Sequence, residues 1–144
     1  MAEEGALVSA AGKRILIVDD EPGVIELLEM ALKKEGFQIE TAADGQEAVE
    51  KIMKARPDLI ILDLKLPRIP GIEILRILQA NDAGDVPVLI MTGQMSNRET
   101  EQMIKLEPNV KGFFTKPLNA GSIAMHVHSL LKTQPIYRNQ APTW

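Results

Sequence analysis

Three carboxylates and one ammonium stand at the ends of short apolar runs in this sequence. Asp19 and Asp20 follow an aliphatic run, Asp63 follows a second one, and Lys116 comes directly after two phenylalanines and a threonine. Short apolar runs of this kind indicate parallel strands buried on both faces, and ligands bind beyond the carboxyl ends of such strands. We therefore expect the four side chains to meet at one edge of a sheet.

The chemistry of this cluster follows from its charge. Three close carboxylates repel one another, so they take up a proton or bind a hard cation, and Mg²⁺ prefers oxygen ligands while keeping several of its waters. An aspartate can also attack phosphorus and form an aspartyl phosphate, provided that the charge on the phosphoryl oxygens is neutralised. Lys116 and the hydroxyl of Thr92, which ends another apolar run, are suited to those oxygens. The sequence thus predicts a Mg²⁺-dependent site for phosphoryl transfer.

The elements that would position this site are predicted from apolar periodicity and turn residues, which give five strands alternating with five helices. The expected strands are 14–18, 38–42, 58–62, 86–91 and 111–115. The expected helices are 22–35, 46–55, 72–80, 97–106 and 119–132. Right-handed crossovers between parallel strands make an α/β three-layer sandwich. We expect the flavodoxin-like strand order 2-1-3-4-5, which places the first and third strands side by side.

Size and composition favour one soluble domain. The chain has 144 residues, of which 45% are hydrophobic and 25% charged, and it has no apolar run of the roughly 18 residues that span a bilayer. We expect no membrane insertion and, because residues 1–12 lack the features of a signal peptide, no secretion. The absence of cysteine suits a cytoplasmic location. A net charge of -4 argues against direct binding to nucleic acid.

The motif set of Asp19-Asp20, Asp63, Thr92-Gly93 and Lys116-Pro117 resembles the receiver domain of bacterial two-component response regulators. The resemblance covers residues 13–132, which leaves 1–12 and 133–144 as expected flexible ends. It implies that Asp63 accepts a phosphoryl group from a sensor histidine kinase or a histidine phosphotransfer protein. The Lys116-Pro117 peptide bond is expected to be cis, because an X-Pro bond adopts that form at low cost.

The resemblance also implies a set of metal ligands. Asp20 and Asp63 would bind Mg²⁺ directly, the backbone carbonyl of Lys65 would be the third protein ligand, and Asp19 would act mostly through water. Receivers of this family are phosphorylated and dephosphorylated themselves, so no turnover of a free substrate is expected.

The resemblance further implies a switch. Thr92 and Lys116 would hold the phosphoryl oxygens, and Phe113 would turn inward when Thr92 moves toward the phosphate. A downstream effector domain or protein would read the changed surface, and the face made of the fourth helix, the fifth strand and the fifth helix can also support a dimer. As a plain apolar side chain, Phe113 is equally well explained by packing.

Two other functions compete with signalling. A phosphohydrolase of the haloacid-dehalogenase type also uses Mg²⁺ and an aspartate nucleophile, but it places a second acid two residues later, where this chain has Lys65 after Asp63. An adaptor that keeps the fold without the switch would not need Asp20, Asp63 and Lys116 together. One departure from the family is the segment Pro108-Asn109-Val110, which stands where a small Gly-Ala pair usually precedes the fifth strand.

Overall fold

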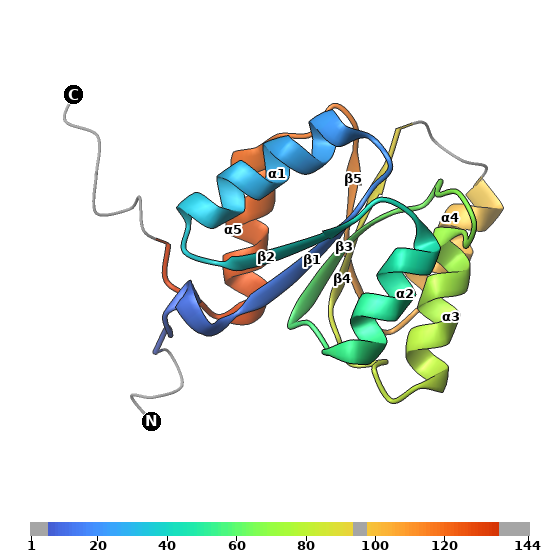
Figure 1. The fold of residues 1–144 in the computed structure, drawn as a ribbon, viewed down its shortest axis with the longest axis horizontal. Helices are drawn as coiled ribbons and strands as arrows, with labels where there is room; N and C mark the ends of the chain where they lie inside the picture. Colours follow the sequence, from blue (N-terminus) through green and yellow to red (C-terminus); the bar gives the residue numbers. More distant parts are fainter. Residues whose placement is uncertain (1–5, 94–97, 136–144) are drawn as a thin grey trace.

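A computed structural model describes residues 6–93 and 98–135 of the chain. It contains one parallel sheet with the strand order β2-β1-β3-β4-β5, as predicted (Figure 1). The strands are β1 (Arg14–Val18), β2 (Gln38–Ala42), β3 (Leu59–Asp63), β4 (Val88–Thr92) and β5 (Val110–Thr115). The helices are α1 (Pro22–Lys34), α2 (Gly45–Lys54), α3 (Gly71–Ala80), α4 (Arg98–Lys105) and α5 (Ala120–Leu131), preceded by the 3-10 turn η2 (Ala10–Gly12).

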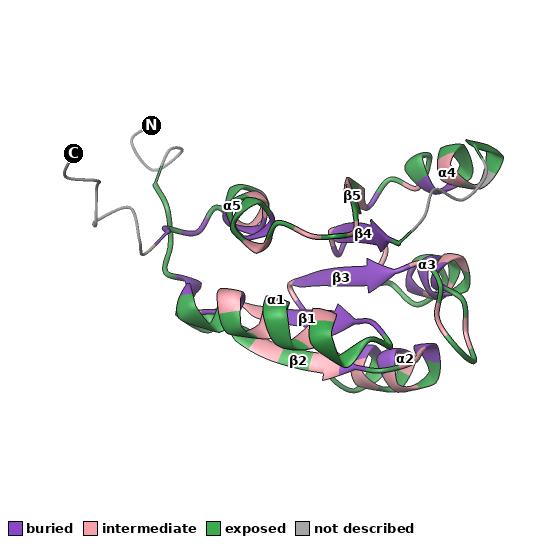
Figure 2. Ribbon diagram, turned by 90° about the horizontal axis from the view of Figure 1, so that it is seen from above, coloured by how far each residue is buried: buried purple, intermediate pink, exposed green. Residues whose placement is uncertain are grey.

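The alternation of side chains along the strands produces two separate cores. On one face of the sheet, residues such as Ile15, Ile17 and Ile61 pack against α1 and α5. On the other face, Leu16 and Leu62 and their neighbours pack against α2 and α3. Figure 1 shows α1 and α5 on one side of the sheet and α2, α3 and α4 on the other. Because β3 and β4 are covered on both faces, they are buried along their whole length (Figure 2).

Helix ends account for most differences from the predicted boundaries. The helix predicted to start at residue 46 begins at Gly45, because Asp44 caps it by accepting a hydrogen bond of 2.8 Å from the amide of Glu47. The helix predicted to start at residue 72 likewise begins one residue earlier. The strand predicted to start at residue 86 begins at Val88, because residue 86 still belongs to a turn. No helix among the described residues is long and apolar enough to cross a membrane.

The two terminal segments meet on one side of the domain. Val8 forms a parallel bridge with Thr133: its amide donates to the carbonyl of Lys132 at 3.0 Å, and its carbonyl accepts from the amide of Gln134 at 2.9 Å. The flexible ends predicted for residues 1–12 and 133–144 lie partly outside the described residues, namely at 1–5 and 136–144.

A buried polar relay lies beneath this bridge. His128 on α5 bonds the Glu35 carboxylate through Nε2 and the Thr133 hydroxyl through Nδ1, both at 2.7 Å. All three residues are buried, and Phe37 packs against the imidazole with 4.9 Å between ring centroids. The relay ties the end of α1 to the end of α5 and to the start of the C-terminal segment.

Replacing His128 with alanine should lower the free energy of unfolding by about 3 kcal/mol, because the buried Glu35 carboxylate would lose its hydrogen bond with the His128 ring. His126→Ala is the matched control. His126 is only partly buried and bonds the backbone carbonyl of Lys111 at 3.1 Å, so we expect a loss of about 1 kcal/mol. Urea unfolding at pH 7 measures both. Equal losses would show that the relay adds nothing beyond an ordinary helix contact.

Candidate functional site

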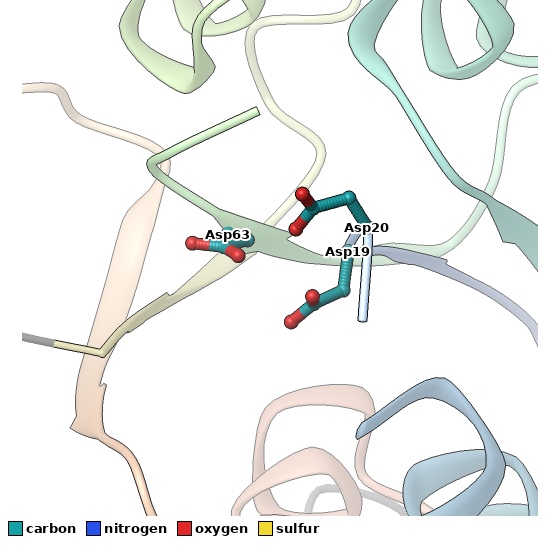
Figure 3. Close-up of side chains that lie close together, drawn as sticks. All are labelled: Asp19, Asp20 and Asp63. Carbon is teal, nitrogen blue, oxygen red and sulfur yellow. The ribbon is translucent and has the colours of Figure 1, made fainter. Parts of the chain in front are cut away.

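Three aspartates lie together at the carboxyl ends of β1 and β3. One carboxylate oxygen from each of Asp19, Asp20 and Asp63 lies within 4.8 Å of the others (Figure 3). Their meeting follows from the pairing of β1 with β3, in which Val18 is opposite Leu62, so that both strands deliver their next residue to the same place. Asp19 and Asp63 are 0% and 4% exposed, whereas Asp20 is exposed to solvent. The structure thus brings together the three carboxylates that the sequence predicted to converge.

The backbone around Asp63 is held closely by the loop that follows it. The amide of Lys65 donates to Asp63 Oδ1 at 3.1 Å, and the amide of Gly71 donates to the carbonyl of Leu64 at 3.1 Å. A Cβ atom at position 71 would lie 2.9 Å from the Asp63 carbonyl oxygen. Only glycine therefore allows α3 to begin this close to the end of β3.

Lys116 approaches the same carboxylates from the end of β5. Its Nζ lies 2.9 Å from Asp19 Oδ2, 3.2 Å from Asp63 Oδ2 and 2.5 Å from an oxygen of Glu21. The amide of Lys116 donates to the carbonyl of Thr92 at 2.8 Å, and the Lys116-Pro117 bond is cis, as predicted. Glu21 was not predicted to belong to the site, although it is the third acid of the run that begins at Asp19.

Burial and neighbouring charge set the protonation of this cluster. Burial raises the pKa of Asp63 and the nearby Asp19 charge adds to this, while the hydrogen bond from the Lys65 amide and the Lys116 ammonium act in the opposite direction. Burial also disfavours the charged form of Lys116, but its contacts with Glu21, Asp19 and Asp63 outweigh this and raise the pKa of Lys116. The lysine therefore stays charged beside these carboxyl groups.

This cluster has the donor set that a hard cation requires. Asp19 Oδ2 is buried and forms an ion pair with Lys116 at 2.9 Å, and it accepts no further hydrogen bond from any described residue. A depression of about 320 Å³, lined in part by Asp19, Asp20 and Glu26, opens from the cluster to solvent. Because all available ligands are oxygens, the residues fit Mg²⁺.

Asp63→Asn should raise the free energy of unfolding at pH 7 in the absence of Mg²⁺. The raised pKa of Asp63 means that the folded state holds this proton more tightly than the unfolded state. The protonated carboxyl thus favours folding below its unfolded pKa, about 4, and this contribution is lost as the pH rises through the folded pKa. Urea unfolding between pH 4 and 8 should show the advantage of the variant shrinking toward pH 4. A difference that does not change with pH would contradict this assignment.

The two predicted switch residues, Thr92 and Phe113, lie on β4 and β5. Thr92 is buried as the last residue of β4, opposite Thr115 of β5 and next to Met91, which pairs with Asp63. Phe113 lies on β5, is partly buried and packs against the core beneath α2 and α3. The Lys105 ammonium of α4 lies 5.4 Å from its ring centroid. Thr92 thus lies on the strand next to Asp63, and Phe113 lies one strand further along the sheet, beside Lys105 of α4.

Comparisons with known proteins give one consistent family. The family model of the response regulator receiver domain matches residues 15–128. The alkaline phosphatase synthesis transcriptional regulatory protein PhoP of Bacillus subtilis is 34% identical over 86% of this chain and 50% of its own length. The transcriptional regulatory protein TrcR of Mycobacterium tuberculosis is 37% identical over 83% of this chain and 45% of its own length. The chain spans about half the length of the curated relatives it matches.

Solved structures agree with this result. The signal receiver domain of a LuxO repressor protein from Vibrio parahaemolyticus has a TM-score of 0.75 and 32% identity, over 83% of this chain and 90% of that one. The receiver domain of a signal transduction histidine kinase from Syntrophus aciditrophicus has a TM-score of 0.73 and 35% identity, over 87% of this chain and 97% of that one.

Proposed function

This chain belongs to the response regulator receiver domain family, and on that premise we propose that it accepts one phosphoryl group on Asp63 in a Mg²⁺-dependent reaction. Membership of the family implies phosphorylation-dependent signalling. The observation that carries the assignment to this residue is the contact of the buried Asp63 with both the acidic cluster and the Lys116 ammonium. The phosphoryl donor would be a sensor histidine kinase or a histidine phosphotransfer protein.

The metal would be held by residues already in place. Asp20 and Asp63 would bind it directly together with the backbone carbonyl of Lys65, and Asp19 would bind it mostly through water. When bound, Mg²⁺ neutralises negative charge on the phosphoryl oxygens. The chain's own contribution is to keep these carboxylates close together and largely away from bulk water, because two of them are buried.

In the transfer step, a carboxylate oxygen of Asp63 forms a bond to phosphorus while the bond between phosphorus and the donor nitrogen breaks, and the imidazole of the donor keeps the electron pair. Lys116 would bind one phosphoryl oxygen and Thr92 another. Thr92 ends β4, the strand next to β3, and Lys116 follows β5, the strand beyond β4, with its ammonium 3.2 Å from Asp63. Attack by water later returns the aspartate and releases phosphate.

The donor protein would approach along a groove beside the site. This groove has a volume of about 490 Å³ and is lined by Lys116 and by apolar side chains that include Val24, Leu27 and Leu118. Leu27 is 45% exposed. A helix that carries a phosphohistidine and flanking apolar residues fits these properties, because it would bury the apolar groove while presenting its phosphoryl group to Asp63.

The output would pass through Thr92 and Phe113 to the face formed by α4, β5 and α5. A phosphoryl oxygen that draws Thr92 toward Asp63 would open space into which Phe113 can turn, and this would shift an existing equilibrium between two arrangements of the face. Met103 of α4 and Leu106, which directly follows this helix, are exposed apolar side chains. An effector domain or protein, or a second copy of the chain, would bind the changed face.

Nucleic acid would be bound by another polypeptide or domain. Relatives include proteins described as transcriptional regulators, and one is described as DNA-binding. This chain itself carries a net charge of -4, which repels a phosphate backbone. A cytoplasmic location is part of the proposal and agrees with a sequence that has no cysteine.

One experiment separates this function from a phosphohydrolase. The protein is incubated with Mg²⁺ and either acetyl phosphate or p-nitrophenyl phosphate, and product release is followed over time. We expect acetyl phosphate to load one phosphoryl group per chain, and p-nitrophenyl phosphate to show no continued turnover, because no acid stands two residues after Asp63. Sustained hydrolysis of p-nitrophenyl phosphate at a catalytic rate would favour the phosphohydrolase.

A further inference from the structure

We propose that Glu21 holds the ammonium of Lys116 in the unphosphorylated protein and competes with the phosphoryl group for it. This inference rests on the proposed function, in which Lys116 binds a phosphoryl oxygen. Of the three carboxylates around Lys116, Glu21 makes the shortest contact, 2.5 Å from Nζ, compared with 2.9 Å for Asp19 and 3.2 Å for Asp63. Glu21 is thus a positioning residue for the lysine.

The backbone of Glu21 is fixed while its carboxylate faces solvent. Its amide donates to Asp19 Oδ1 at 2.8 Å, and its carbonyl accepts from the amides of Val24 and Ile25 in the first turn of α1. The Glu21 side chain is 59% exposed, whereas those of Asp19 and Asp63 are 0% and 5% exposed. When the ammonium leaves, water solvates the exposed carboxylate more readily than the two buried ones. The ion pair between Glu21 and Lys116 is therefore the one that breaks when Lys116 moves to the phosphoryl group.

The position of Glu21 also affects the approach of the donor. Glu21 and Lys116 line the same groove, so an anionic phosphodonor that enters from this side meets the Glu21 charge next to the ammonium it must reach. Glu21 should therefore slow transfer from small anionic donors and weaken the binding of phosphoryl mimics. A donor protein that places a basic side chain against Glu21 would remove this obstacle.

The test compares Glu21→Gln with Glu26→Gln. Glu26 is exposed and lines the depression on the side of Asp19 and Asp20, not the groove that contains Lys116, so the control removes the same charge from the same helix region. With acetyl phosphate and Mg²⁺, Glu21→Gln should be phosphorylated about 5-fold faster than wild type, in line with a single exposed charge interaction. It should also bind beryllium fluoride about 5-fold more tightly, measured by NMR titration. Glu26→Gln should stay within about 2-fold of wild type for both.

A second readout needs no phosphorylation. In the resting protein without Mg²⁺, acylation of Lys116 by acetic anhydride, mapped by mass spectrometry, should be several-fold faster in Glu21→Gln than in wild type or Glu26→Gln. If acylation of Lys116 is unchanged in Glu21→Gln, the inference is overturned while the proposed function stands. The same holds if Glu21→Gln is phosphorylated at the rate of Glu26→Gln, or more slowly than wild type. If wild type takes up no phosphoryl group at all, the proposed function fails, and the competition fails with it.

Discussion

Replacing Lys116 with alanine should slow the phosphorylation of Asp63 by about 10²- to 10³-fold, the cost of removing a preorganised charge from a site where negative charge develops. Lys116 lies within 3.2 Å of Asp63 and its side chain is only 12% exposed, so water cannot replace the ammonium at the same place. The rate is measured as the increase in intact mass with time in phosphoramidate and saturating Mg²⁺.

The matched control for this variant is Lys111→Ala. Lys111 is an exposed residue of β5, so its removal changes the net charge equally without touching the acidic cluster, and the rate should stay within about 2-fold of wild type. Unfolding curves in Mg²⁺ confirm that both variants are folded. A folded Lys116→Ala variant that is phosphorylated within about 5-fold of the wild-type rate would remove the lysine from the proposed mechanism.

The second large effect concerns the metal. Asp20→Ala should weaken Mg²⁺ binding by at least about 100-fold, since partners one step further from a metal already contribute 10- to 100-fold. The variant should fold normally without Mg²⁺, because removing one of three crowded carboxylates relieves repulsion. A ligand at 100 times its dissociation constant stabilises a protein by about 2.7 kcal/mol. The Tm of wild type should therefore rise at Mg²⁺ concentrations that leave the Tm of Asp20→Ala unchanged.

Glu29→Gln provides the control for the metal titration. Glu29 lines the same depression as Asp20 and forms an ion pair with Lys33 at 2.8 Å, so its replacement removes an acid from this region without removing a ligand. Its Mg²⁺ midpoint should match wild type. An Asp20→Ala variant with the wild-type midpoint would place the cation elsewhere, and one that is unfolded at room temperature would make the pair of aspartates structural.

The sheet could be predicted because its strands are short apolar runs with clear limits. The pattern of residues around Leu62 requires burial on both faces, which fixes a parallel sheet and the edge at which Asp63 must emerge. The first and last residues of the helices and strands could not be predicted as well, because they depend on contacts with residues far away in the sequence. The start of α3 at Gly71, for example, is set by its close approach to the carbonyl of Asp63.

Side chains that act through distant partners could not be predicted. Glu21 contacts Lys116, which is 95 positions away, and Glu35 bonds His128 across 93 positions, so neither pair leaves a periodic signal. Asn109 is a third case. It stands in the segment that departs from the family pattern, is buried, and donates to the carbonyl of Val86 at 3.1 Å. The unusual segment thus has a structural explanation in the turn before β4.

The most direct test of the central claim is intact-mass measurement of wild type and Asp63→Asn after incubation with acetyl phosphate, with and without Mg²⁺. If the acidic cluster uses a divalent cation to make Asp63 the phosphoryl acceptor, only wild type with Mg²⁺ gains the mass of one phosphoryl group. Equal modification of Asp63→Asn, or uptake by wild type that does not depend on Mg²⁺, would contradict it.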